Sequence, residues 1–201
     1  MFIIGITGGS GAGKTSALRA AERLGALALD CDEVYHELLT RSAALKAELE
    51  TRFPGVLQDG VIDRERLGEI VFRDPSALLD LNAIAHKYVS QEVGRRLDAW
   101  KAQGGTVAAI DAIALIEGGA GCKCNFIIGV TAPEDLRIQR IMARDGITRE
   151  QARRRVNAQK PDSFFMDNCD YILHGIYDTA EAFEEKCEEF FAELINGRCT
   201  G

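Results

Sequence analysis

No stretch of the sequence approaches the roughly 20 consecutive apolar residues that a membrane-spanning helix needs. Basic residues are also in deficit, because 31 acidic against 24 basic side chains leave a net charge of −7. A nucleic acid requires a basic footprint, so this balance argues against a nucleic-acid partner. The apolar start of the chain is too short for a secretory leader. We therefore expect a cytoplasmic protein with no membrane partner.

The sequence also lacks the cysteine and histidine spacings that are typical of metal sites and disulfide frameworks. The six cysteines do not follow the paired spacing of zinc sites, and the three histidines, His36, His86 and His174, lack metal-ligand spacing. A chain of 201 residues buries a core large enough to need no covalent staples, so we expect reduced thiols. No internal repeat or low-complexity linker is visible, and the length suits one domain.

Short apolar segments alternate with helical patterns along the chain. Strands are predicted at 2–7, 26–29, 107–111, 126–131 and 171–173. Helices are predicted at 14–24, repeatedly between 33 and 104 with Asp63 as an N-cap, at 133–144, after Thr148 with Gln151 as a capping box, and at 179–195. Buried strands that alternate with helices are typical of an α/β fold with a parallel sheet, here of five strands.

Residues 8–16 read GGSGAGKTS, a full match to the phosphate-binding loop pattern G-x-x-x-x-G-K-[ST]. An apolar strand precedes the loop and an amphipathic helix follows it, which is the context the motif requires. The motif predicts binding of ATP phosphates by Gly8, Gly9, Ser10, Gly11, Ala12, Gly13, Lys14, Thr15 and Ser16. Backbone amides would surround the anion, Lys14 would supply a cation, and the Thr15 hydroxyl would face Mg²⁺.

Three aspartates follow predicted strands. Asp30 and Asp32 lie two residues apart at the end of the second strand, so an extended backbone would put both side chains on one side. A carboxylate there can accept a hydroxyl proton, although a solvated turn or a helix cap would use the same residues. Asp111 ends the third strand, where P-loop enzymes keep an acidic residue near magnesium. The sequence leaves open whether Asp32 or Asp111 lies closer to the metal.

Eight of the 24 basic residues fall between Arg137 and Lys160. Arg137, Arg140 and Arg144 share one helical stripe, and three more arginines follow at 153–155. Guanidinium groups suit the charge that spreads over a transferring phosphoryl group. The alternative is a solvated face paired with Glu134, Asp135 and Glu150.

Beyond the phosphate loop, several segments resemble the dephospho-CoA kinase family over almost the whole chain. These are GITGGSGAGKTS, DCDEVYHELL, DGVIDRERLGEIVF, LNAIAH, IDAIALIEGG and RIMARDGITREQARRRVNAQ. The loop alone is shared with many kinases, whereas the aspartate pair and the RDGIT segment are more specific. The resemblance implies ATP-dependent phosphorylation of the ribose 3'-hydroxyl of dephospho-CoA, the last step of coenzyme A synthesis.

The resemblance also implies three parts within one P-loop kinase domain, 1–201: a nucleotide-binding core at 1–32, 105–136 and 161–201, a helical acceptor-binding insertion at 33–104, and an arginine-bearing lid at 137–160. It implies that Asp32 is the catalytic base and that Lys14, Arg140 and Arg144 stabilise the transferring phosphate. The acceptor site would include Leu115, Ile116 and Glu117. His36 follows Asp32 by one helical turn and could reach the same pocket.

Three positions depart from the family pattern: Ile113 or Ala114, where proline is frequent; Lys87, after His86, where a histidine-proline pair is frequent; and Gly175, near which the family often has asparagine. The first two concern the acceptor pocket and the third the adenine contact. Two other functions stay open, another small-molecule P-loop kinase and a nucleotide-dependent switch, although the N-K-x-D and D-x-x-G motifs of guanine-nucleotide switches are missing. The sequence does not give the oligomeric state, and a monomer is slightly favoured.

Overall fold

The computed structural model describes residues 1–199. The chain divides into two compact units. The first comprises Met1–Asp30 and the chain from Trp100 onward, and the second comprises Cys31–Ala99. The segment predicted as a helical insertion, 33–104, overlaps the second unit.

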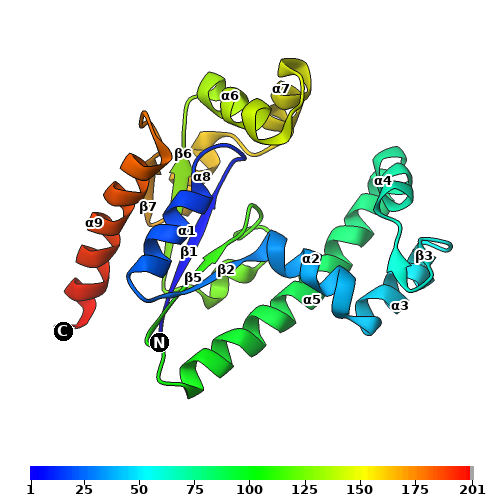
Figure 1. Cartoon of the computed structure of the whole chain (residues 1–201), viewed down its shortest axis with the longest axis horizontal. Helices are drawn as coiled ribbons and strands as arrows, with labels where there is room; N and C mark the ends of the chain where they lie inside the picture. The colour runs from blue at the N-terminus through cyan, green and yellow to red at the C-terminus, as the bar shows by residue number, and fades with distance from the viewer. Residues whose placement is uncertain (200–201) are drawn as a thin grey trace. The chain divides into compact units, whose positions relative to one another are not determined.

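The first unit is built on a five-stranded sheet (Figure 1). Its strands are β1 (Phe2–Gly8), β2 (Leu27–Asp30), β5 (Val107–Asp111), β6 (Phe126–Thr131) and β7 (Tyr171–His174). They run in the order β2-β5-β1-β6-β7, and every neighbouring pair is parallel. The predicted α/β fold with a parallel sheet of five strands is therefore confirmed. The carboxyl ends of all five strands meet at one edge of the sheet.

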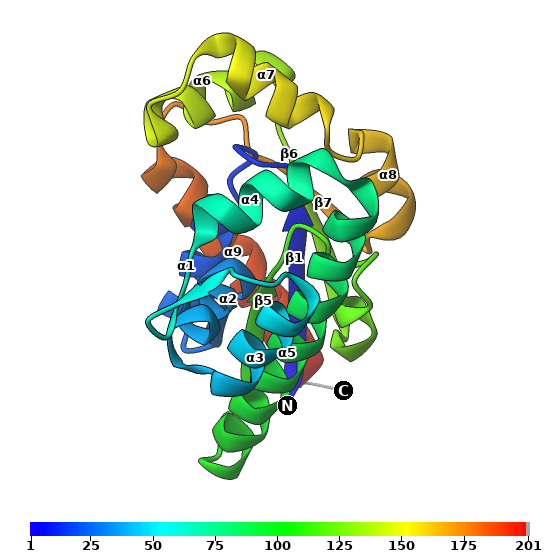
Figure 2. The same cartoon turned by 90° about the vertical axis from the view of Figure 1, so that its right-hand side faces the viewer.

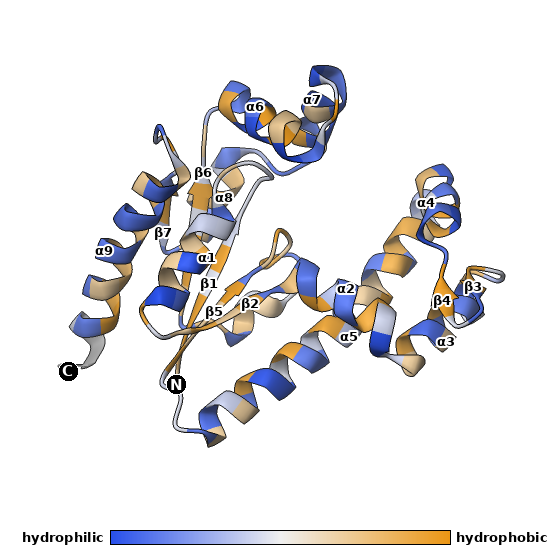
Figure 3. Ribbon diagram, viewed as in Figure 1, coloured by the Kyte–Doolittle hydropathy of each residue, from blue (hydrophilic) through white to orange (hydrophobic). Residues whose placement is uncertain are grey.

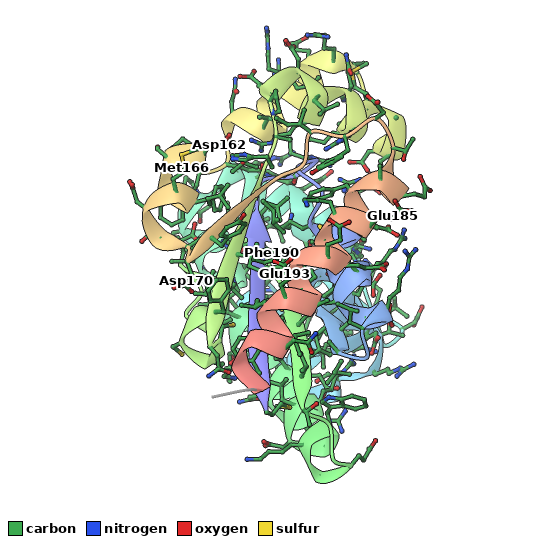
Figure 4. All side chains as sticks on the ribbon, turned by 90° about the vertical axis from the view of Figure 1, so that its left-hand side faces the viewer. Asp162, Met166, Asp170, Glu185, Phe190 and Glu193 are labelled. Atoms are coloured by element: carbon green, nitrogen blue, oxygen red, sulfur yellow. The ribbon has the colours of Figure 1, made fainter. Side chains whose placement is uncertain are left out.

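Helices cover both faces of this sheet. On one face, α1 (Lys14–Arg23) and α9 (Ala180–Cys199) pack together, with small alanines of α1 in the same core cluster as Phe183 and Phe191 of α9. On the other face, α8 (Asp162–Asn168) places Phe165 against Gly129 of β6. Figure 4 shows α8, with Asp162 and Met166, across the strands from α9, with Phe190 and Glu193. Colouring by hydropathy shows β1, β5 and β6 as apolar strands between these layers (Figure 3).

Two helices follow β6 within the same unit, α6 (Glu134–Asp145) and α7 (Arg149–Asn157). They form a small core of their own from Ile138, Ile141, Ala152 and Val156. The predicted capping box is confirmed: the Thr148 side chain accepts from the Gln151 backbone, and the Gln151 side chain accepts from the Thr148 backbone. The predicted lid segment, residues 137–160, covers most of this helix pair.

The second unit is mainly helical. It contains α2 (Cys31–Arg41), α3 (Ala43–Arg52), α4 (Arg64–Arg73) and most of α5 (Pro75–Ala102). Leu45, Leu49 and Phe53 form its buried centre together with residues of α4 and α5. The predicted N-cap of α4 is confirmed, because the Asp63 carboxylate accepts from the Arg66 backbone at 3.0 Å.

Three elements were not predicted from the sequence. They are the hairpin of β3 (Leu57–Gln58) and β4 (Val61–Ile62), the helix α8, and a short 3₁₀ helix at Ala120–Lys123. The expected reduced thiols are found at Cys122, Cys124, Cys169 and Cys187, and burial raises the pKa of Cys187 to about 12. Within residues 1–199, every helix is too short or too polar to cross a membrane.

Candidate active site

The phosphate-binding loop leaves the carboxyl end of β1, the central strand, and leads directly into α1. Gly13 is the N-cap of α1 and has a φ of 117°, a left-handed conformation that favours glycine. A glycine cap has no side-chain oxygen to occupy the first amides of the helix, so these amides remain available to an anion. Lys14, half-buried in the first turn, has no carboxylate partner within the described part of the chain. The geometry therefore suits a bound phosphate group.

Two side chains from the predicted lid segment hold the apex of this loop. The Gln159 amide both accepts from the Ser10 backbone N–H at 2.9 Å and donates to the Ser10 hydroxyl at 2.7 Å. Arg137 donates from Nε to the Ser10 carbonyl at 3.0 Å and from Nη2 to Gln159 Oε1 at 2.7 Å. Figure 2 shows the loop between β1 and α1 beneath α6 and α7. We call these three residues, Ser10, Arg137 and Gln159, the loop clasp.

Arg137 is buried, with 5% of its surface exposed. Burial lowers the pKa of its guanidinium, an effect that nearby Asp162 and Glu134 oppose. The closest carboxylate oxygen, on Asp162, lies 3.8 Å from the guanidinium. The shorter hydrogen bonds of Arg137 go to the Ser10 carbonyl and to Gln159 Oε1. Arg137 therefore holds the phosphate loop in place through the backbone carbonyl of Ser10.

The two arginines predicted to act on the transferring phosphate differ in their surroundings. Arg140 donates from Nη1 to the Gly11 carbonyl at 3.2 Å, and burial lowers the pKa of its guanidinium. Arg144 is exposed and pairs with Asp145, with its Nε 2.7 Å from Oδ1. Arg155 pairs with the same carboxylate. In this structure, Arg140 therefore contacts the loop whereas Arg144 belongs to a surface ion-pair group.

Two of the predicted aspartates end neighbouring strands of the sheet. Asp111 is the last residue of β5, and it is in register with Ile6 of β1 and with Asp30 of β2. Only 5% of its surface is exposed. Both carboxylates consequently lie at the edge from which the phosphate loop departs, where oxygen ligands for a hard cation would be needed.

The expectation that Asp30 and Asp32 share one side of an extended strand is wrong. β2 ends at Asp30 and α2 begins at Cys31, so Asp32 lies exposed in the first turn of a helix. Residues two apart on a helix do not face each other. Asp32 and Glu33 carry negative charge into that first turn, which stabilises a helix N-terminus and favours an early start. Asp32 and His36 both belong to the second unit, and they lie one turn apart on α2.

The remaining predicted acceptor residues lie in the turn after β5. Leu115 is fully buried, and an added Cβ at Gly5 would meet its side chain, so this side chain is part of the core. Ile116 is half-buried and Glu117 is exposed. Gly175 follows β7 and approaches the phosphate loop closely: a Cβ at this position would lie 2.1 Å from the Ala12 carbonyl oxygen. The position of the Ala12 carbonyl in the phosphate loop therefore favours glycine, which has no Cβ, at position 175.

A cavity of about 460 Å³ adjoins the start of α1. Its walls come from Gly13 and Ser16, from Leu136 and Arg140 of α6, and from Tyr177 and Phe183. Tyr177 and Phe183 stack with ring centroids 5.3 Å apart. The cavity thus combines aromatic and aliphatic walls with one cation beside the phosphate loop.

Sequence reasoning missed Gln159 and the special role of Arg137. Arg137 was recognised as part of the stripe but could not be distinguished from Arg140 and Arg144. A single glutamine after a helix carries no local signal, because its partner Ser10 is 149 residues away. The sequence offers one signal for the close approach of Gly175 to the phosphate loop. This signal is a glycine at the start of the short segment that joins β7 to α9.

Known proteins match this chain over most of its length. A family model described as dephospho-CoA kinase matches residues 2–179. The dephospho-CoA kinase of Geobacter sulfurreducens is 34% identical over 195 residues, which cover 96% of this chain and 98% of the relative. That of Brucella melitensis is 30% identical over 197 residues, with 98% and 95% covered.

Solved structures agree with these matches. A Thermus thermophilus protein superposes with a TM-score of 0.79 at 29% identity, over 96% of this chain and 97% of the other. Shikimate kinase from Acinetobacter baumannii, at 19% identity and a TM-score of 0.55 over 98% and 94% of the two chains, shares the fold alone. With a phosphate loop on a parallel sheet and full-length relatives at 30% identity or more, the chain belongs to the dephospho-CoA kinase family.

Proposed function

We propose that this protein transfers the γ-phosphate of ATP to the ribose 3'-hydroxyl of dephospho-CoA, giving coenzyme A and ADP. The 3'-oxygen forms a bond to the γ-phosphorus while the bond from that phosphorus to the β,γ-bridging oxygen breaks. The hydroxyl proton passes to a carboxylate, for which we propose Asp32, and the bridging oxygen leaves with ADP. Electrostatic stabilisation and positioning supply most of the acceleration in such transfers.

The observation that carries this proposal is the phosphate loop on the central strand, with a glycine-capped helix behind it, in a chain of this family. Lys14 supports it further, because its ammonium lacks a carboxylate partner in the part of the chain that the structure describes. A cation in that position is suited to the β- and γ-phosphates. Arg140 would add a second positive charge from α6.

Thr15 and Asp111 fit a magnesium ion by the chemistry of their donors, a hydroxyl and a carboxylate at the same edge of the sheet. Magnesium, when bound, neutralises charge on the phosphate oxygens. Among the described residues no group of three or more histidine, cysteine or acidic side chains could hold a metal alone. This agrees with an ion held mainly by ATP and water, with only one or two protein ligands.

The cavity beside Gly13 suits the base and ribose of ATP. Its stacked aromatic pair offers apolar contact area, and its position next to the loop suits the rest of a nucleotide whose phosphates lie in the loop. The contacts proposed for Ile116 and Glu117 with the acceptor, the cytoplasmic location and the monomeric state remain predictions from the sequence.

A coupled assay of ADP release tests the proposal, with a panel of acceptors that includes dephospho-CoA, a nucleoside and shikimate. We expect turnover with dephospho-CoA far above that with the other acceptors. The matched control is Lys14→Ala, which should lower turnover by roughly 10²-fold or more because its charge acts in a dry site. Turnover that does not require dephospho-CoA, or a Lys14→Ala variant with full activity, would refute the assignment.

A further inference from the structure

Two cysteines lie close together at the end of the turn after β5. Cys122 belongs to the 3₁₀ helix Ala120–Lys123, and Cys124 caps the carboxyl end of that helix. Cys122 is exposed and Cys124 is half-buried, and both are reduced. We call Cys122 and Cys124 the thiol pair.

The chain itself keeps the Cα atoms of the thiol pair within disulfide range. Two residues span at most about 7 Å when extended, and a 3₁₀ helix is more compact, with a rise of about 2 Å per residue. A disulfide joins Cα atoms that lie about 4.4–6.8 Å apart. Gly118, Gly119 and Gly121 precede the pair, so the local backbone can adjust as the bond closes.

The present contacts of the two thiols are weak. The Cys122 thiol donates to the Gly119 carbonyl at 2.9 Å, and the Cys124 thiol lies 3.8 Å from the Ala120 carbonyl. A thiol is a poor hydrogen-bond donor, so little stability is lost when either side chain rotates away from its carbonyl. Both sulfurs are therefore available for a bond to each other.

The two thiols differ in how readily they react. Burial raises the pKa of Cys124 to about 11, the nearby Cys122 thiol raises it too, and Lys123 opposes the shift. Cys124 is therefore almost entirely protonated at neutral pH, and its thiolate is scarce. The exposed Cys122 is the sulfur that a dissolved reagent meets first.

We propose that Cys122 and Cys124 form a reversible redox pair that exchanges with low-molecular-mass disulfides. The Cys122 thiolate attacks one sulfur of the reagent, a mixed disulfide forms, and the other sulfur leaves as a thiolate that takes up the proton lost by Cys122. The Cys124 thiolate then attacks the Cys122 sulfur, and the second half of the reagent leaves with the proton from Cys124. Two protein thiols are thereby oxidised to one disulfide, and the reagent is reduced to two thiols.

Cys124 connects this chemistry to the strand that leads into the phosphate loop. A Cβ at Gly5 of β1 would lie 2.9 Å from Cys124 Sγ and 2.6 Å from the Leu115 side chain, so both side chains pack at one point of β1. Leu115 is buried in the turn that follows Asp111. A bond to Cys122 draws the Cys124 sulfur away from β1, so this turn must shift.

The proposed function makes the effect of that shift measurable. Displacements of about 1 Å near reacting groups can cost up to roughly 10²-fold in rate, so we expect oxidation to lower turnover roughly 10-fold or more. This second part of the inference rests on the proposed function, whereas the exchange reaction does not.

Peptide analysis tests the exchange reaction. The reduced protein is incubated with oxidised glutathione, its remaining thiols are alkylated, and the monomer from a non-reducing gel is digested with trypsin. Trypsin cleaves after Lys123, between the two cysteines, so a disulfide links peptide 102–123 to peptide 124–137. We expect these linked peptides in the wild type and their release by dithiothreitol.

Serine variants identify the role of each sulfur. Cys122→Ser should give no linked peptides, and Cys124→Ser should keep glutathione on Cys122, because the thiol that would displace it is missing. The matched control is Cys169→Ser, which removes another half-buried cysteine and should form the linked peptides as the wild type does. Wild-type protein with both Cys122 and Cys124 alkylated after the treatment would overturn the inference.

Turnover tests the effect on the active site. The acceptor is dephospho-CoA with a methylated thiol, because the free thiol of the substrate would itself reduce the pair. We expect the oxidised wild type to be roughly 10-fold or more slower than the same sample after dithiothreitol, with no such difference in Cys122→Ser. Linked peptides with unchanged turnover would refute the effect on the active site. A reduced wild type that transfers no phosphate would refute the proposed function instead, and the peptide analysis would still decide the redox pair.

Discussion

Replacing Gln159 by leucine removes the centre of the loop clasp while keeping a side chain of similar size. The change deletes two hydrogen bonds to Ser10, one to its backbone N–H and one from the amide to its hydroxyl. It also removes the oxygen that accepts from Arg137 Nη2 at 2.7 Å. Because Arg137 is buried, water does not readily replace that acceptor.

The expected loss follows from these contacts. Each neutral hydrogen bond contributes about 1 kcal/mol, and the bond to the charged guanidinium about 1.5–3 kcal/mol. The three are coupled, so we expect the free energy of unfolding to fall by about 3 kcal/mol. For a chain of this size, that corresponds to a melting temperature lower by about 6–12 °C.

Gln159 is proposed as a positioning residue, so the same variant should bind ATP less tightly. In the variant, ATP binding would have to bring the phosphate loop back to its wild-type conformation. If this costs about 1–2 kcal/mol, KM for ATP rises roughly 5- to 30-fold. Gln159→Glu keeps an acceptor for Ser10 and Arg137 but adds a negative charge beside the phosphate site. Gln159→Glu should therefore have a higher melting temperature than Gln159→Leu, and its KM for ATP should still exceed that of the wild type.

Thermal melting and steady-state kinetics over a range of ATP concentrations measure both effects. Gln103→Leu is the matched control, because Gln103 is exposed after α5 in the same unit. A Gln159→Leu variant with the melting temperature and KM for ATP of the control would refute the clasp. If KM for ATP changed only in proportion to the melting temperature in both Gln159 variants, the residue would be structural alone.

Two further substitutions test other parts of the site. Gly175→Ala should lower stability by about 1–3 kcal/mol and raise KM for ATP, because its Cβ would lie 2.1 Å from the Ala12 carbonyl and displace the loop; wild-type melting and KM would show that the loop tolerates the methyl group. Asp32→Asn should lower kcat roughly 10²- to 10⁴-fold with KM for ATP nearly unchanged, whereas Asp30→Asn should mainly lower the melting temperature. The opposite pattern in kinetics would reverse the roles of the two aspartates.

Local patterns in the sequence predicted much of the fold. The five strands are short apolar runs that end at glycine or polar residues, and the parallel sheet follows from their alternation with helices. The N-cap Asp63 and the capping box at Thr148 were predicted because each bond joins residues three apart in the chain. The phosphate loop was predicted for the same reason, since its whole motif spans residues 8–16.

Other features depend on contacts that the sequence does not display. The Asp59-Gly60 turn is a hairpin signal, but its strands have only two residues each and lie among helical patterns. The early start of α2 was missed because Asp30 and Asp32 flank a boundary that either a strand or a helix could occupy. The clasp and the close approach of Gly175 join segments more than 100 residues apart, so only the folded chain reveals them.

The fate of the γ-phosphate tests the central claim most directly. ATP carrying ³²P at the γ-position is incubated with dephospho-CoA and the protein, and the products are separated and identified. The account predicts one labelled coenzyme A per ADP formed, with the label on the ribose 3'-oxygen. Label that appears only in inorganic phosphate, or at any other position of the acceptor, would contradict it.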